Sequence, residues 1–259
     1  MYNLGTILTP TNLVLFIAII TRLSGLLSTA PFFSTYPIPR QALVWFAATI
    51  AFVLFPIIKA STGFVLPTSV PALMIILIKE FIIGFAIGFC ANLILIGVEI
   101  GANMFSTQMG LSVSSALNPL SGSASPVITQ AYVLLVGMIF LCVNGHHLMF
   151  SALYHSFVSM PIGFRFDFSP QLVEQIIHMS SQMFTIGMEL VLPIFAILFM
   201  TDVLLGFTSK MMPQLNIFMV SMPLKLYIGT LLSIMFTRGM AEHSEVIIER
   251  ILSHIMAVF

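Results

Sequence analysis

A small set of charged side chains stands inside long apolar stretches of this sequence, where each could carry a proton or bind a polar partner. The set consists of Arg22, Lys79, Glu80, Glu189 and Asp202. A charge at the centre of a membrane helix costs roughly 2.5 to 3.5 kcal/mol on insertion scales, so lipid exposure of the whole set would destabilise a monomer. Lys79 and Glu80 are adjacent and project about 100° apart on a helix, so each is predicted to need another partner.

Polar side chains also recur at steps of three and four residues along one apolar segment, which places them on one helix face. They are Glu174, His178, Gln182, Thr185 and Glu189. One interpretation is a stripe that faces a conduit or a polar neighbouring subunit. The other interpretation is that the first half of the stripe is the water-exposed end of the helix. Asp202 lies well off this stripe, so we predict that it forms a separate contact between helices or subunits.

The remaining chemistry-bearing residues do not form a recognisable site. No HExxH or paired-cysteine spacing accompanies His146, His147, His155 or His243, and adjacent histidines project in different directions. A P-loop, a GxSxG elbow and a dinucleotide fingerprint are also lacking in the sequence. We therefore predict no catalytic residue, metal or cofactor, and the chain is not predicted to be an enzyme. Cys90 and Cys142 both lie in apolar segments, and we predict no disulfide.

Composition identifies the elements that must position these residues. Hydrophobic residues make up 59% of the 259 residues, charged residues 7%, and the mean hydropathy is +1.10, as in integral membrane proteins. At about 20 residues per span the chain supplies about six helices and leaves little for a soluble domain. The predicted helices are Thr11 to Leu27, Ala42 to Ile58, Ala72 to Gly101, Ile128 to Val143, Val173 to Leu205 and Met222 to Phe236.

Breakers and periodicity predict the connecting segments. Prolines make Pro31 to Arg40 and Lys210 to Phe218 short, stiff connections. Asn144 and Gly145 predict a helix stop at which the glycine takes the left-handed cap. Apolar residues at three- and four-residue steps predict an amphipathic helix from Gly239 to Phe259. The segment before Pro10 lacks the basic region of a signal peptide, so we expect it to remain in the mature chain.

The orientation of the helices is not set by their charges. If every predicted helix crosses the membrane, one side carries the cations Arg40, Lys210 and Lys225, and the other carries Lys59, Arg165 and Arg238. The positive-inside rule therefore gives a tie. Either the predicted helix ends are misplaced, or some helices form hairpins inside a larger protein assembly instead of crossing the bilayer separately.

A long charge-free region separates the third and fourth predicted helices and continues beyond them. No Asp, Glu, Lys or Arg occurs from Ile100 to Phe164, and the part from Asn103 to Pro126 is too polar and too rich in breakers for a spanning helix. Irregular backbone at membrane depth must be satisfied by protein or by a water-filled cavity. We interpret this part as an enclosed loop, such as a pore lining or a plug.

Several spaced motifs together resemble the FliR family, the flagellar member of a group that includes the SctT proteins of virulence-type secretion systems. They cover nearly the whole chain in the same order: Arg22, Gly25, Pro31 to Arg40, Gly97-Val98-Glu99-Ile100-Gly101, Gln108 to Ser112, Asn144-Gly145-His146-His147, Ser156-Phe157, Pro161-Ile162-Gly163, Pro213 to Phe218 and Pro223-Leu224-Lys225. The Asn-Gly-His-His corner and the lack of a long C-terminal extension favour the flagellar branch.

The resemblance implies an all-α subunit of the flagellar type III export gate in the bacterial inner membrane, within the basal body. Residues 1–165 would be built like FliP and residues 166–259 like FliQ, as hairpins in a helical hetero-oligomer. The implied partners are FliP-like and FliQ-like subunits, FlhB-like and FlhA-like proteins, membrane lipid and unfolded export substrates, with no nucleic acid.

The resemblance also implies a plug in the loop at residues 104–119. Its residues are Met104, Phe105, Gln108, Met109, Gly110, Leu111, Ser112, Val113, Ser114, Ser115, Ala116, Leu117, Asn118 and Pro119. Asn118 departs from the acid expected there in many relatives, which puts any role of that charge in doubt. Polar contacts between subunits or helices are expected at Arg22, Arg40, Lys79, Glu80, Glu99, Glu189, Asp202, Lys210, Gln214, Asn216 and Lys225.

Two other functions fit the residues. A small secondary transporter would use Glu189 and Asp202 as proton carriers and a broken helix near Gly110 to bind substrate, although the sequence has no convincing inverted repeat. A purely structural membrane scaffold would need no plug, so removal of the loop would change neither leak nor secretion.

Overall fold

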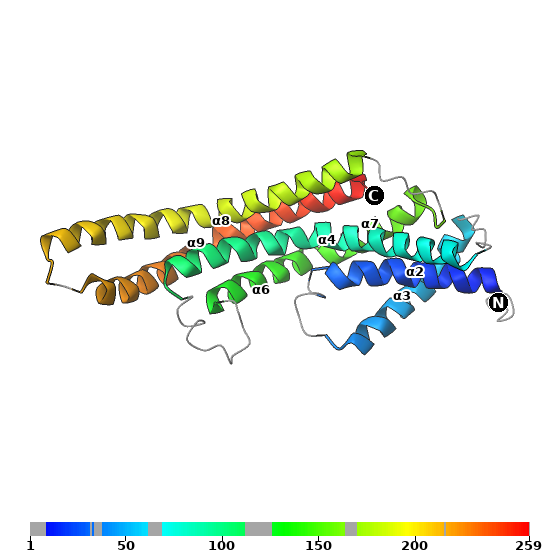
Figure 1. The fold of residues 1–259 in the computed structure, drawn as a ribbon, viewed down its shortest axis with the longest axis horizontal. Helices are drawn as coiled ribbons and strands as arrows, with labels where there is room; N and C mark the ends of the chain where they lie inside the picture. The colour runs from blue at the N-terminus through cyan, green and yellow to red at the C-terminus, as the bar shows by residue number, and fades with distance from the viewer. Residues whose placement is uncertain are drawn as a thin grey trace. The chain divides into compact units, whose positions relative to one another are not determined.

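The computed structural model describes residues 9–31, 33, 38–61, 69–111, 126–163, 170–214 and 216–258, most of which belong to long helices (Figure 1). The helices are α2 (Pro10–Thr29), α3 (Arg40–Ser61), α4 (Val70–Gln108), α6 (Val127–Cys142), α7 (Gly145–Ser159), α8 (Pro170–Met211) and α9 (Ile217–Val258). No strand occurs in these ranges. The prediction of an all-α membrane protein is confirmed.

Within these ranges, the apolar helices account for up to 6 membrane spans. Long enough and apolar enough by themselves are α2, α3, α4, Val191–Met211 of α8 and Met219–Gly239 of α9, and the pair of α6 and α7 adds another if it counts as one span. The helices α4, α8 and α9 contain 39, 42 and 42 residues. At 1.5 Å per residue each is about 60 Å long, roughly twice the thickness of the hydrocarbon core of a bilayer.

Several predicted helices were too short, and one helix was missed. α4 continues beyond Gly101 to Gln108, and α8 continues beyond Leu205 to Met211. α9 begins at Ile217, before the predicted Met222, and runs without a break through Gly239, where a separate amphipathic helix was predicted. The missed helix is α7, in a segment that the sequence interpretation treated as a polar corner. At the start of α7 it is Asn144, not Gly145, that adopts the left-handed conformation, with φ 59° and ψ 30°. Asparagine is one of the few residues that tolerate this region, and Gly145 is already helical.

The chain forms two compact units, each assembled from segments distant in the sequence. The first comprises residues 1–92, 144–179 and 249–259, and the second comprises residues 93–143 and 180–248. The division at residue 165 into FliP-like and FliQ-like parts concerns likeness to partner proteins and stays a prediction.

In the first unit α2 is the helix around which the others pack. Its residues Ala18, Ile19, Leu23 and Leu26 are fully buried. Against α3, the rings of Phe16 and Phe55 meet edge to face at 6.0 Å. The contact with α4 is much closer, because glycines in both helices leave room for backbone to touch backbone, as in small-xxx-small packing of membrane helices. These glycines are Gly25, Gly84 and Gly88.

The second unit repeats this close packing between different helices. Gly101 of α4 faces Gly187 of α8, and a methyl group added to Gly101 would lie 2.5 Å from the Gly187 carbonyl oxygen. α6 joins the unit through Tyr132, whose ring meets Phe105 of α4 edge to face at 5.4 Å. The Tyr132 hydroxyl donates to the Ser233 carbonyl of α9 at 2.8 Å. One aromatic residue therefore joins α6 to two other helices.

Candidate functional site

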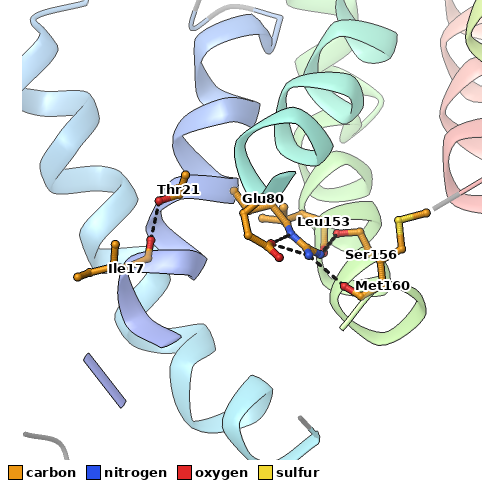
Figure 2. A network of polar contacts seen from close by, with 7 residues as sticks. Ile17, Thr21, Glu80, Leu153, Ser156 and Met160 are labelled. Carbon is orange, nitrogen blue, oxygen red and sulfur yellow. Dashed lines mark hydrogen bonds and ion pairs between the residues drawn. The ribbon is translucent and has the colours of Figure 1, made fainter. Parts of the chain in front are cut away.

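The first unit contains a buried polar network centred on Arg22. The Arg22 Nε donates to Glu80 Oε2 at 2.6 Å, its Nη1 donates to Ser156 Oγ at 3.0 Å, and its Nη2 donates to the Met160 carbonyl at 3.0 Å. Figure 2 shows Glu80, Ser156 and Met160 converging on one point from α4 and from α7 with the residue that follows it. The guanidinium also stacks over the Phe157 ring at 4.1 Å. The network therefore joins α2, α4 and α7 at one residue.

The electrostatics of this network follow from its complete burial. The Arg22 and Glu80 side chains are 0% and 3% exposed, so an unpaired charge at either position would be severely penalised. Ser156 accepts from Arg22 and donates to the Leu153 carbonyl at 2.6 Å, which leaves its hydroxyl satisfied. A fully paired network of this kind fixes the geometry of the helices that supply it, because partial breakage leaves buried groups unsatisfied. Arg22 and Glu80 come together here within one chain.

Lys79 lies beside this network without entering it. It is half-buried and lines a shallow hollow with Ile76, Glu80, Ile83 and Met160. No ion pair joins it to any residue in the described part of the chain. The prediction that Lys79 and Glu80 each need a separate partner thus has different outcomes. Glu80 binds Arg22, whereas Lys79 lines the hollow.

The end of α4 shows why the predicted loop begins later than expected. Ser106 Oγ and Thr129 Oγ1 are 3.1 Å apart, Thr129 Oγ1 donates to Asn103 Oδ1 at 3.0 Å, and Thr107 Oγ1 donates to the Asn103 carbonyl at 2.7 Å. Polar residues with such partners do not interrupt a helix, so Met104, Phe105 and Gln108 are helical. The sequence interpretation missed Thr129, although a polar residue in the first turn of the next apolar helix was a usable signal.

A glycine turn ends α4. Gly110 has φ 83°, its amide donates to the Thr107 carbonyl at 3.0 Å, and the Leu111 amide donates to the Ser106 carbonyl at 3.1 Å. This is the Schellman arrangement, in which a left-handed glycine satisfies the last helical carbonyls. The other predicted plug residues, Ser112 to Pro119, lie outside the described residues.

A second polar cluster lies at the same end of α4. Gln108 Nε2 donates to Asp202 Oδ2 of α8 at 2.7 Å, and Lys225 of α9 forms an ion pair with Asp202 Oδ1. Next to it, Met109 is 1% exposed and its side chain lies against Gly229 of α9, where a methyl group would be 2.6 Å from the Met109 sulfur. The structure therefore brings together Gln108, Asp202 and Lys225, which are dispersed in the sequence.

The other predicted polar residues are not brought into either cluster. Exposed side chains belong to Arg40, Lys210, Gln214 and Asn216, and Glu99 is half-buried. Along the predicted stripe, Glu174, His178, Thr185 and Glu189 are exposed and Gln182 is half-buried. In the described ranges no group of three or more His, Cys, Asp or Glu residues is placed to hold a metal ion, and Cys90 and Cys142 are free.

Comparison with known proteins gives one consistent group of relatives. The family described as "Bacterial export proteins, family 1" matches residues 13–251. The chain is 28% identical over 221 residues to the flagellar biosynthetic protein FliR of Bacillus subtilis (strain 168), covering 85% of this chain and 84% of that protein. It is 29% identical over 208 residues to FliR of Escherichia coli (strain K12), covering 80% and 78%. It is 31% identical over 177 residues to the Yop proteins translocation protein T of Yersinia pestis, covering 66% of each.

Proposed function

Because this chain belongs to the bacterial export proteins of family 1, with FliR among its relatives, we propose that it is a core subunit of the flagellar type III export gate. It is a multi-pass protein of the inner membrane and a component of a flagellar or type III export apparatus. With FliP-like and FliQ-like subunits it forms the closed conduit through which unfolded flagellar components leave the cell. FlhB-like and FlhA-like proteins bind the same complex in the basal body.

The loop that follows α4 is proposed as the plug of this conduit. The observation that carries the proposal is the absence of charge from Ile100 to Phe164, including a polar, breaker-rich stretch between apolar helices. A loop in bulk water has no reason to exclude charge, whereas an enclosed loop must. Since residues up to Gln108 are helical, the part of the proposed plug at 104–119 that follows α4 starts at Met109, and all its side chains are uncharged.

The test is a deletion in the assembled complex. Removal of Gly110 to Ser115 is expected to raise the ion conductance of the membrane, measured in cells or in planar bilayers that contain the purified complex. The matched control deletes Leu120 to Ser125, which shortens the same connection equally but spares the proposed plug. An assembled complex in which the first deletion leaks no more than the control would contradict a plug.

The transporter alternative makes different demands on Asp202. A proton carrier must exchange its proton, whereas the Asp202 carboxylate is engaged by Gln108 and Lys225 at the same time. Co-expression with the membrane partners separates the two functions. A stable hetero-oligomer is expected for a gate subunit, and a well-behaved solitary protein with proton-coupled transport would establish the alternative.

A further inference from the structure

The cluster at the end of α4 occupies the point where the proposed plug loop leaves the helix. Gln108 is the last residue of α4, and Met109, Gly110 and Leu111 form the turn that follows it. We propose that Gln108, Asp202 and Lys225 form a clamp, named here the α4 clamp, that holds the base of the loop, the turn from Met109 to Leu111, on α8 and α9. The proposal rests on the proposed function of the loop as a plug, and assigns the three residues as positioning residues for it.

Asp202 is the shared acceptor of the α4 clamp. One carboxylate oxygen receives the Gln108 amide and the other receives the Lys225 ammonium. The Lys225 and Asp202 side chains are only 17% and 35% exposed, so the pair is partly shielded from screening by water and salt. Hydrogen bonds to an ionised group are roughly twice as strong as neutral ones. Gln108 therefore makes a strong contact without adding a charge to the charge-free region in which it lies.

Apolar packing fixes the residues that follow Gln108. The Met109 side chain is buried over Gly229, and a methyl group added to Gly110 would lie 3.4 Å from the Met222 side chain. Both contacts are made to α9, the helix that also supplies Lys225. The base of the loop can leave α8 and α9 only if the Gln108 to Asp202 bond breaks and Met109 withdraws from Gly229. The α4 clamp and the Met109 contact with Gly229 thus hold the base of the loop together.

An exchange of chemical groups tests the α4 clamp. Gln108→Glu places a second carboxylate against that of Asp202, and Asp202→Asn removes the carboxylate that pairs with Lys225. The double variant again has one amide facing one carboxylate beside Lys225. Loss of the charge-assisted bond is expected to raise the conductance of the assembled complex roughly tenfold in each single variant. The double variant is expected to return close to the original value. Gln41→Glu, which makes the same exchange of an amide for a carboxylate at an exposed position of α3 outside the charge-free region, is the matched control and is expected to leave conductance unchanged.

A second readout follows the base of the loop itself. In a Cys90→Ala, Cys142→Ser background, a Met109→Cys probe is expected to resist maleimide labelling and to become reactive when either single variant is introduced. Gln108→Met removes only the hydrogen bond to Asp202 and keeps the ion pair with Lys225. It is used in place of Gln108→Glu or Asp202→Asn if either of these variants fails to assemble. Its expected labelling and leak lie between those of the original complex and Asp202→Asn.

The two readouts separate the α4 clamp from the plug. Increased labelling and leak in the single variants, both reversed in the double variant, support the clamp. Unchanged labelling and leak in the single variants overturn it, as does a double variant that behaves like the single ones. If labelling responds but neither the single variants nor the Gly110 to Ser115 deletion leaks, the clamp holds the base of the loop and the plug function is wrong.

Discussion

The Arg22 guanidinium and the Glu80 carboxylate, separated by 58 residues in the sequence, lie 2.6 Å apart with almost no exposure to solvent. Ser156 and the Met160 carbonyl bind the other guanidinium nitrogens, so α2, α4 and α7 depend on the same cation. A buried ion pair adds little to stability compared with well-packed apolar residues, yet the loss of one partner leaves the other unpaired.

Loss of Glu80 alone is therefore expected to destabilise the chain more than loss of both partners. Glu80→Met leaves a buried, uncompensated guanidinium and is expected to lower the free energy of unfolding by about 3–5 kcal/mol, whereas Arg22→Met/Glu80→Met recovers much of this loss. Thermal unfolding of the purified complex in detergent measures the difference. Arg238 and Glu242 form an exposed pair one turn apart, so Glu242→Met serves as the control and is expected to leave the Tm unchanged. Equal Tm values for the single and double variants would contradict a charge effect.

The close contact of α2 and α4 predicts a strong effect of one methyl group. An alanine at Gly84 would meet the backbone of Arg22, with its Cβ 2.8 Å from the carbonyl carbon, and backbone atoms cannot turn aside. Gly84→Ala is expected to cost about 1–3 kcal/mol of stability, as overpacking does elsewhere. Gly206 of α8 has nothing within 4 Å of an added Cβ, so Gly206→Ala is expected to be neutral or to stabilise by about 0.5–1 kcal/mol. Similar Tm shifts for Gly84→Ala and Gly206→Ala would show that the close backbone contact at Gly84 does not penalise an added methyl group.

The left-handed backbone at Asn144 predicts an order among its substitutions. Asn144→Gly is expected to keep the stability, because glycine adopts positive φ without a steric penalty. A β-branched residue clashes in this region, so Asn144→Val is expected to cost about 1–2 kcal/mol. Unfolding of both variants under one set of conditions provides the comparison. The prediction fails if valine and glycine are tolerated equally.

The Tyr132 hydroxyl predicts a smaller, separable effect. Tyr132→Phe removes the bond to the Ser233 carbonyl but keeps the edge-to-face contact with Phe105, so a loss of about 0.5–1.5 kcal/mol is expected. The Ser233 carbonyl still accepts from Thr237 Oγ1 at 2.7 Å, which limits the penalty. Tyr132→Leu loses the ring contact as well and is expected to have a lower Tm than Tyr132→Phe. Equal Tm values for Tyr132→Phe and Tyr132→Leu would assign the stabilisation to the hydroxyl alone.

Predictions from the sequence succeeded where composition alone decides the outcome. Long apolar runs without charge predicted the membrane helices, since burial of apolar surface does not depend on which helices are neighbours. Helix ends were less predictable at Asn103 to Gln108, because polar residues there are satisfied by Thr129 and Asp202, which are distant in the sequence. α7 was missed because Asn144 and Gly145 predicted a helix stop, whereas the left-handed Asn144 lies directly before a new helix.

By itself, the sequence determined that this protein is helical and membrane-embedded and that Arg22, Glu80 and Asp202 need partners; that the region after α4 is enclosed stays a prediction. These conclusions follow from the cost of placing charge and unpaired backbone in an apolar medium, which is a property of each residue. Only the tertiary structure decided the pairing: Glu80 with Arg22, and Asp202 with both Gln108 and Lys225. Pairing depends on glycines that let α2 approach α4 and on turns that bring α8 and α9 together, and these are relations between distant segments.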